Sequence, residues 1–176
     1  MNDRVTLVEV GPRDGLQNEP GRVDTATKIE LIRRLADCGL KAIEPTAFVS
    51  PKWVPQMADA AEVMAGLPDR EDLRFPVLVP NEQGLERALE AGAQEIAVFT
   101  AASETFNRKN INAGIAESLR RFEPVCERAL AEGLRVRGYI SCVLGCPYEG
   151  QVPVSTVVSV AVQLRSLGCH EISLGD

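Results

Sequence analysis

Four glycines mark the places in this chain where a helical pattern gives way to a strand-like one. Gly39, Gly92, Gly133 and Gly168 each follow apolar residues at helical spacing and stand a few residues before a short apolar run. Glycine is the residue most often found just past the end of a helix. Helices that alternate with strands indicate βα units with parallel strands. The pattern therefore predicts an α/β fold.

Six strands are predicted, over 5–10, 42–48, 74–79, 95–99, 136–141 and 171–174. Asp24 is expected to cap the first helix, and Ser50-Pro51 to begin the second. Asn110 is expected in a loop after the fourth strand, ahead of a longer helix that ends at Gly133. Two architectures fit this order, an open doubly wound sheet and a (β/α)₈ barrel.

Polar residues near the ends of the predicted strands favour the barrel. Arg13 and Asp14 follow the first strand, Glu44 lies in the second, and Asp176 follows the sixth. Functional groups at the carboxyl end of many strands are typical of a barrel's active face. Because a complete barrel has eight strands, we predict that 1–176 is one partial TIM-barrel catalytic domain with strands one to six present and strands seven and eight absent.

Composition excludes several classes of function. The formal net charge of −6 argues against nucleic acid as the main partner. No apolar run approaches the roughly 20 residues needed to span a bilayer. Residues 1–4 lack the basic and apolar regions of a signal peptide, so that a cytoplasmic location is expected. Five cysteines without an export signal are expected to be reduced thiols.

The segment VGPRDGLQNE (10–19) gathers charges and amides directly after an apolar run. Taken alone, Asp14 could shape a turn before Gly15, and Arg13 could be a surface cation. Alternation along the second strand gives a separate indication. Since Ile43 is apolar, Glu44 should point to the opposite face, toward the barrel axis.

Longer motifs add a family resemblance. They are VEVGPRDGLQNE (8–19), FVSPKWVPQM (48–57), AASETFNRKNIN (101–112), VRGYISCVLGCPYEG (136–150) and EISLGD (171–176). As a set spread over the entire chain, they closely resemble the 3-hydroxy-3-methylglutaryl-CoA lyases, which are metal-dependent TIM-barrel enzymes.

The resemblance implies a retro-Claisen cleavage of hydroxymethylglutaryl-CoA into acetyl-CoA and acetoacetate, with Mg²⁺ or Mn²⁺ as cofactor. Arg13 matches the family's catalytic arginine, Asp14 its first metal ligand, Glu44 its active-site glutamate and Asp176 its active-site aspartate. The substrate-binding residues implied are Arg13, Gln17, Asn110 and Ser173. The resemblance also implies a small-molecule acyl-CoA partner, a homodimer for the full-length protein, and a place in leucine breakdown and ketone body formation.

Some positions depart from the family pattern. Pro20 and Ala47 stand where relatives usually have lysine and serine, and the family's metal-binding histidines would lie beyond Asp176. Turnover by the 176-residue chain alone is therefore not expected. The alternatives are an inactive truncated remnant of such a lyase, or a related acyl-CoA or oxo-acid aldolase of the same superfamily.

Four further side chains are expected to serve structure rather than chemistry. His170, the only histidine, is expected to pack or to lie on the surface, because it precedes the sixth strand, at the end away from the active face. Trp53 is expected to pack against the second helix. Cys142 and Cys146 are expected to be small packing residues.

Overall fold

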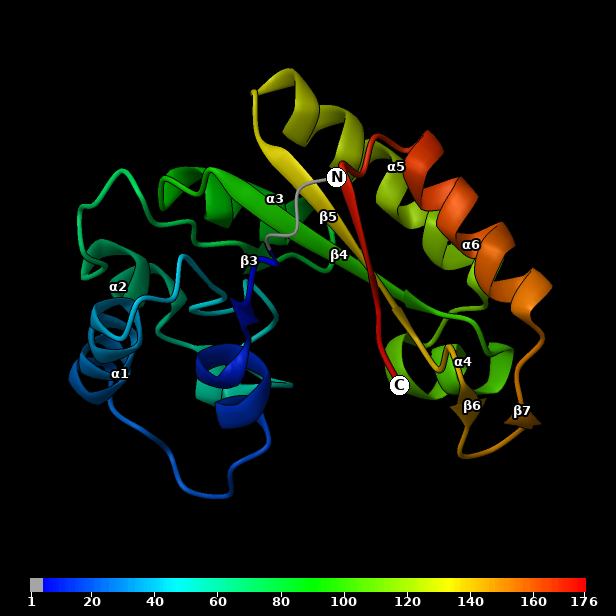
Figure 1. Cartoon of the computed structure of the whole chain (residues 1–176), viewed down its shortest axis with the longest axis horizontal. Helices are drawn as coiled ribbons and strands as arrows, with labels where there is room; N and C mark the ends of the chain where they lie inside the picture. The colour runs from blue at the N-terminus through cyan, green and yellow to red at the C-terminus, as the bar shows by residue number, and fades with distance from the viewer. Residues whose placement is uncertain (1–4) are drawn as a thin grey trace. The chain divides into compact units, whose positions relative to one another are not determined.

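The computed structural model describes residues 5–176 and divides into two compact units (Figure 1). The first unit takes in the described residues up to Val79 together with Gln83–Glu95, and the second takes in Pro80–Glu82 and Ile96–Asp176. The expectation of no signal peptide falls on residues 1–4, which lie outside the described residues.

The first unit alternates short strands with helices. Its elements are β1 (Val8–Glu9), the π-helix η1 (Gly11–Gly15), α1 (Thr25–Asp37), β2 (Ala42–Ile43), the 3₁₀-helix η2 (Pro55–Met57), α2 (Ala60–Ala65), β3 (Val77–Leu78) and most of α3 (Glu82–Glu90).

Helix α1 begins and ends as the sequence predicts. The Asp24 side chain caps it by accepting a hydrogen bond from the Thr27 amide at 2.9 Å. Gly39, with φ of 100°, follows its last turn. Its buried face carries Ile32, which packs in one cluster with Ile43 of β2. Burying one such side chain stabilises the fold by about 1.5–3 kcal/mol.

The strands of this unit are parallel, as predicted, but shorter than predicted. Val8 pairs with Ala42 and Glu9 with Ile43 in a parallel ladder. The second strand was expected to run from 42 to 48, but Pro45 has no amide hydrogen to donate to a ladder. Pairing resumes only as an isolated parallel bridge at Ala47.

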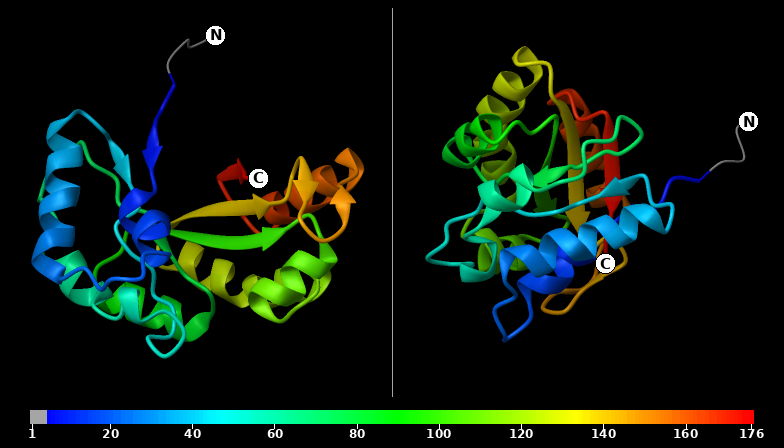
Figure 2. Two further views of the ribbon diagram at one scale, coloured as in Figure 1. Left: turned by 90° about the horizontal axis from the view of Figure 1, so that it is seen from below. Right: turned by 90° about the vertical axis from the view of Figure 1, so that its left-hand side faces the viewer.

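Three strands of the second unit run in the same direction (Figure 2). They are β4 (Glu95–Ala101), whose first residue belongs to the first unit, β5 (Arg135–Ser141) and β8 (Glu171–Leu174). β5 and β8 pair in parallel from Arg137 opposite Glu171 to Ile140 opposite Leu174. Helices α5 (Ile115–Ala131) and α6 (Val154–Ser166) pack against this sheet and against each other (Figure 1). Their buried faces include Phe122 and Leu164.

Two predictions about this unit were incomplete. The segment expected to be a loop after β4 contains α4 (Glu104–Ile111), so that Asn110 lies in a helix. The Ser103 side chain caps α4 by accepting from the Phe106 amide, and Asn112, with φ of 51°, ends it. The antiparallel pair β6 (Gly145–Cys146) and β7 (Gly150–Gln151) was not predicted.

The region around Trp53 also differs from prediction. Residues 51–53 form a turn, and the helical segments begin only at Pro55 and Ala60. The Trp53 side chain is 81% exposed, so the prediction that it packs against the second helix was wrong. Within the part of the chain that the structure describes, no helix is both long enough and apolar enough to cross a membrane.

Candidate active site

The tight turn after β1 is the best-defined feature of the site, and we call residues 10–16 the active-site turn. The Val10 carbonyl accepts hydrogen bonds from the amides of Arg13 (3.1 Å) and Asp14 (2.7 Å). The Gly11 amide donates to Glu9 Oε1 at 2.7 Å. A Cβ atom on Gly11 would lie 2.8 Å from that oxygen, so a side chain there would force the Glu9 carboxylate to move.

This turn brings together three of the predicted site residues. Arg13 donates from Nε to Glu44 Oε1 and from Nη1 to Asp14 Oδ1, the second bond being 2.7 Å long. Glu44 is completely buried and Arg13 is 8% exposed, whereas the Asp14 side chain is 56% exposed. Arg13 therefore bridges a buried carboxylate and an exposed one.

The orientation of Glu44 agrees with the alternation predicted from the sequence. Ile43 packs into the α1 cluster, and the Glu44 amide, directly after β2, donates to the Glu9 carbonyl at 2.8 Å. The Glu44 side chain pairs with Arg13. A buried carboxylate needs such a partner because its desolvation is costly.

The charges of Arg13, Asp14 and Glu44, the Arg–Asp–Glu trio, suit two tasks. The guanidinium is planar and permanently charged, and bonds to two carboxylates fix its orientation. A fixed cation of this kind can stabilise negative charge that develops on a substrate oxygen. The exposed carboxylate of Asp14 offers the hard oxygen ligands that Mg²⁺ prefers.

A groove of about 380 Å³ lies beside the active-site turn. Gln17, a predicted substrate contact, is half-buried and lines it. The exposed Trp53 lines it as well. The remaining lining residues are Asn18, Glu19, Pro20, Arg22, Val54, Pro55 and Gln56.

The remaining predicted site residues belong to the second unit. Ser173 is half-buried in β8, opposite Tyr139 of β5. Asp176 follows β8, and its Oδ1 accepts hydrogen bonds from the amides of Leu144 (3.0 Å) and Gly145 (3.1 Å). Asn110 is exposed in the last turn of α4.

Two buried thiols lie near the carboxyl ends of β4 and β5, and their burial agrees with the predicted packing role. Cys146 Sγ lies 3.0 Å from Ser103 Oγ. Burial alone would raise the pKa of Cys146, but hydrogen bonds from Ser103 and from the Tyr148 and Glu149 amides outweigh it, so that this pKa falls below its ordinary value. Burial, with the neighbouring Cys146, raises the pKa of Cys142 to about 11. No pattern in the sequence predicts the contact between Ser103 and Cys146.

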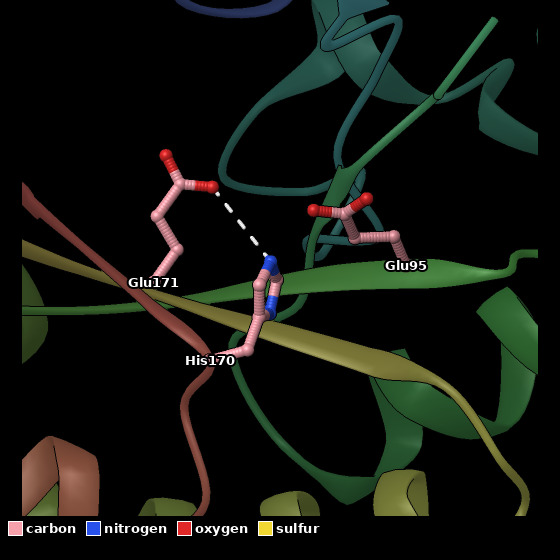
Figure 3. A group of neighbouring side chains, drawn as sticks. All are labelled: Glu95, His170 and Glu171. Atoms are coloured by element: carbon pink, nitrogen blue, oxygen red, sulfur yellow. Dashed lines mark ion pairs between the residues drawn. The ribbon is translucent and has the colours of Figure 1, made fainter. Parts of the chain in front are cut away.

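His170 lies at the opposite end of β8 from Asp176. Its Nδ1 is 2.7 Å from the Val136 carbonyl, which also accepts the His170 amide at 2.9 Å. Its Nε2 lies 3.7 Å from Glu171 (Figure 3). These backbone contacts agree with the predicted packing role. Glu95, drawn in the same figure, belongs to the first unit.

Parallel βα units with an Arg–Asp–Glu trio at the ends of the first two strands place the protein in the α/β class of the barrel type. The HMGL-like family model matches residues 4–176, and the chain belongs to this family. The prediction of a partial TIM barrel is confirmed, because the mixed α/β fold matches solved structures of the family.

The individual relatives agree with this assignment. The chain is 60% identical over 172 residues to the cytoplasmic 3-hydroxy-3-methylglutaryl-CoA lyase of Danio rerio, covering 98% of this chain and 51% of that protein. It is 56% identical over 173 residues to the mitochondrial hydroxymethylglutaryl-CoA lyase of Bos taurus, covering 98% of this chain and 53% of that protein. The chain therefore spans about half the length of these curated relatives.

A solved structure shows the same likeness. The hydroxymethylglutaryl-CoA lyase of Pseudomonas aeruginosa matches with a TM-score of 0.96 at 56% identity, covering 98% of this chain and 58% of that one. The resemblance stated from the sequence motifs is thus confirmed.

Proposed function

We propose that this chain supplies part of the active site of a hydroxymethylglutaryl-CoA lyase, which cleaves 3-hydroxy-3-methylglutaryl-CoA to acetyl-CoA and acetoacetate. The observation that carries the proposal is the Arg13 guanidinium held between the buried Glu44 and the exposed Asp14. The activity named for the relatives at 56–60% identity supports it.

In the proposed reaction the tertiary hydroxyl of the substrate loses its proton and the neighbouring carbon–carbon bond breaks. The electron pair of that bond moves onto the thioester, as an enolate that is then protonated to give acetyl-CoA. We assign to Arg13 the stabilisation of charge on the enolate oxygen, which develops only during cleavage. Glu44 and Asp176 are proposed to transfer protons. Gln17, Asn110 and Ser173 are proposed to contact the substrate.

Asp14 is the proposed ligand of a divalent cation, Mg²⁺ or Mn²⁺. Its carboxylate is more than half exposed and provides hard oxygen atoms, so that the donor chemistry fits either ion. When bound, such an ion would polarise the oxygen atoms of the substrate.

The proposed partner is an acyl-CoA. A lyase from Acinetobacter baumannii, 38% identical with a TM-score of 0.90 and covering 96% of this chain and 56% of that one, was solved in complex with coenzyme A and 3-methylmalate. We further propose a homodimer and a cytoplasmic location. The names of the relatives include both cytoplasmic and mitochondrial forms.

The test is an assay of the product of the complete gene against several 3-hydroxyacyl thioesters, with and without Mg²⁺ or Mn²⁺. We expect acetoacetate and acetyl-CoA to be released from hydroxymethylglutaryl-CoA only when the metal is present. Cleavage of a different thioester alone would overturn the proposal in favour of a related aldolase. An absence of cleavage of every thioester would indicate an inactive protein.

A further inference from the structure

Gln56 is a buried side chain that reaches three backbone groups, one in the last residue of the active-site turn and two in the segment that follows it. Its Nε2 donates to the carbonyls of Leu16 (3.1 Å) and Gly21 (3.0 Å), and its Oε1 accepts from the Val23 amide (3.1 Å). The residue is 7% exposed. A primary amide has two donor hydrogens and one acceptor oxygen, so that these contacts engage both of its ends.

The contact with Leu16 links Gln56 to the proposed catalytic residues. Leu16 directly follows η1, and its backbone amide donates back to carbonyls of that helix. Residues 18–24 form no helix or strand, so regular secondary structure does not hold this part of the chain. The Gln56 side chain supplies long-range hydrogen bonds that hold it.

Gln56 is itself held by α1. Lys28 is 2% exposed and donates from Nζ to the Gln56 carbonyl, and the same Nζ lies 2.7 Å from Asp59 Oδ1. Asp59 Oδ2 accepts a further hydrogen bond from Thr25 Oγ1 at 2.8 Å. A buried polar network therefore joins α1, through Gln56, to the end of the active-site turn.

We infer that Gln56 is a positioning residue, which fixes the active-site turn and with it Arg13 and Asp14. The catalytic part of this inference rests on the proposed function. Gln56 acts through the backbone at Leu16, not through contact with substrate. Without its hydrogen bonds the turn samples orientations in which the guanidinium is displaced, and displacement of about 1 Å can cost two orders of magnitude in rate.

Amide hydrogen exchange on the 176-residue chain tests the inference without any turnover. In Gln56→Met, which keeps the volume but loses the hydrogen bonds, we expect peptides covering residues 11–19 to exchange about 10-fold faster, with α1 unchanged. Gln94→Met is the matched control, because Gln94 is exposed and its side chain bonds to the carbonyl of the nearby Gly92. Unchanged exchange over 11–19, or an equal increase throughout α1, would overturn the inference.

A second variant keeps the test decisive if Gln56→Met does not fold. Gln56→Glu retains the acceptor for Val23 but loses both donors, so that the same local increase in exchange is expected. Because exchange needs no activity, it decides this inference even where the proposed function fails.

A kinetic measurement separates positioning from a loss of folded protein. In the product of the complete gene, Gln56→Met is expected to lower kcat about 10- to 100-fold while KM changes by less than about threefold. Gln94→Met should leave both constants unchanged. A kcat that Gln56→Met does not alter would contradict the inference, whereas a wild-type protein that cleaves no thioester would contradict the proposed function instead.

Discussion

Arg13 is set apart from an ordinary surface arginine by its two carboxylate neighbours. Its side chain is 10% exposed, and Glu44, with which it pairs, is fully buried. Arginine suits this place because its planar fork can contact two carboxylates in fixed directions, whereas lysine carries one compact charge on a flexible chain. The role proposed for Arg13 therefore requires its geometry as well as its charge.

Arg13→Lys keeps the charge and removes that geometry. We expect kcat for thioester cleavage to fall about 10²- to 10³-fold, as when one donor to a developing oxyanion is lost. Steady-state kinetics on the product of the complete gene would measure the fall. Arg33→Lys on the exposed face of α1, where Arg33 pairs with Glu30, is the control and should have wild-type kinetics. An equally active Arg13→Lys would rule out the proposed role.

The residue contacts divide into those that local sequence predicts and those that it does not. Glu44 was placed opposite Ile43 by strand alternation alone, and its bond to Arg13 agrees with that placement. The contacts of Gln56 with Leu16, Gly21 and Val23 span 33 to 40 residues of sequence and follow no periodicity. Side-chain bonds to a distant backbone depend on the folded path of the chain, which a repeating pattern does not encode.

Among the secondary-structure elements, α1 and α2 are connected by a buried ion pair between Lys28 and Asp59. Burial raises the pKa of Asp59, but hydrogen bonds from Lys28 and Thr25 outweigh it and hold this pKa below its ordinary value of 3.8. The native state therefore binds fewer protons at Asp59 than the unfolded state does. The stabilisation is complete above about pH 4 and is lost as pH falls through the lowered pKa.

Asp59→Asn leaves Lys28 buried without its counter-charge. We expect a loss of about 3–5 kcal/mol in the free energy of unfolding at pH 7, the usual cost of breaking a buried pair. Urea titration from pH 7 to pH 3 should show the difference from wild type shrinking in acid. Asp72→Asn breaks exposed pairs with Lys41 and Arg70 and should cost much less, because solvent screens exposed ion pairs. Equal costs for the two variants would contradict this account.

The order of the elements was predicted more accurately than their lengths. Glycines with positive φ stand at all four predicted helix ends, and β8 has the predicted bounds. The first strand was expected over 5–10 but pairs only at Val8–Glu9, and Val5 and Leu7 are exposed. Apolar periodicity reports a tendency toward extended backbone, whereas strand length depends on which neighbouring strand is available to pair.

At the scale of the whole molecule, the chain contains two compact units and covers 51% to 58% of the relatives described above. Within the second unit β8 is the end strand of its sheet. The neighbouring helix α6 buries Val157, Val160 and Leu164. Three other valines recur on α6 at a spacing of four residues and are exposed: Val154, Val158 and Val162.

We expect these exposed valines, together with the end strand β8, to favour self-association of the 176-residue chain. Burying one valine contributes roughly 1.5 kcal/mol, so that replacing two with charged residues should weaken association about 100-fold or more. We expect wild type to form concentration-dependent oligomers in sedimentation velocity, and the double variant Val158→Lys, Val162→Glu to remain monomeric at the same concentrations. Ser155→Lys, at an exposed position of the same helix, is the control and should associate like wild type. A single monomeric boundary for wild type at all concentrations would show that this face does not drive association.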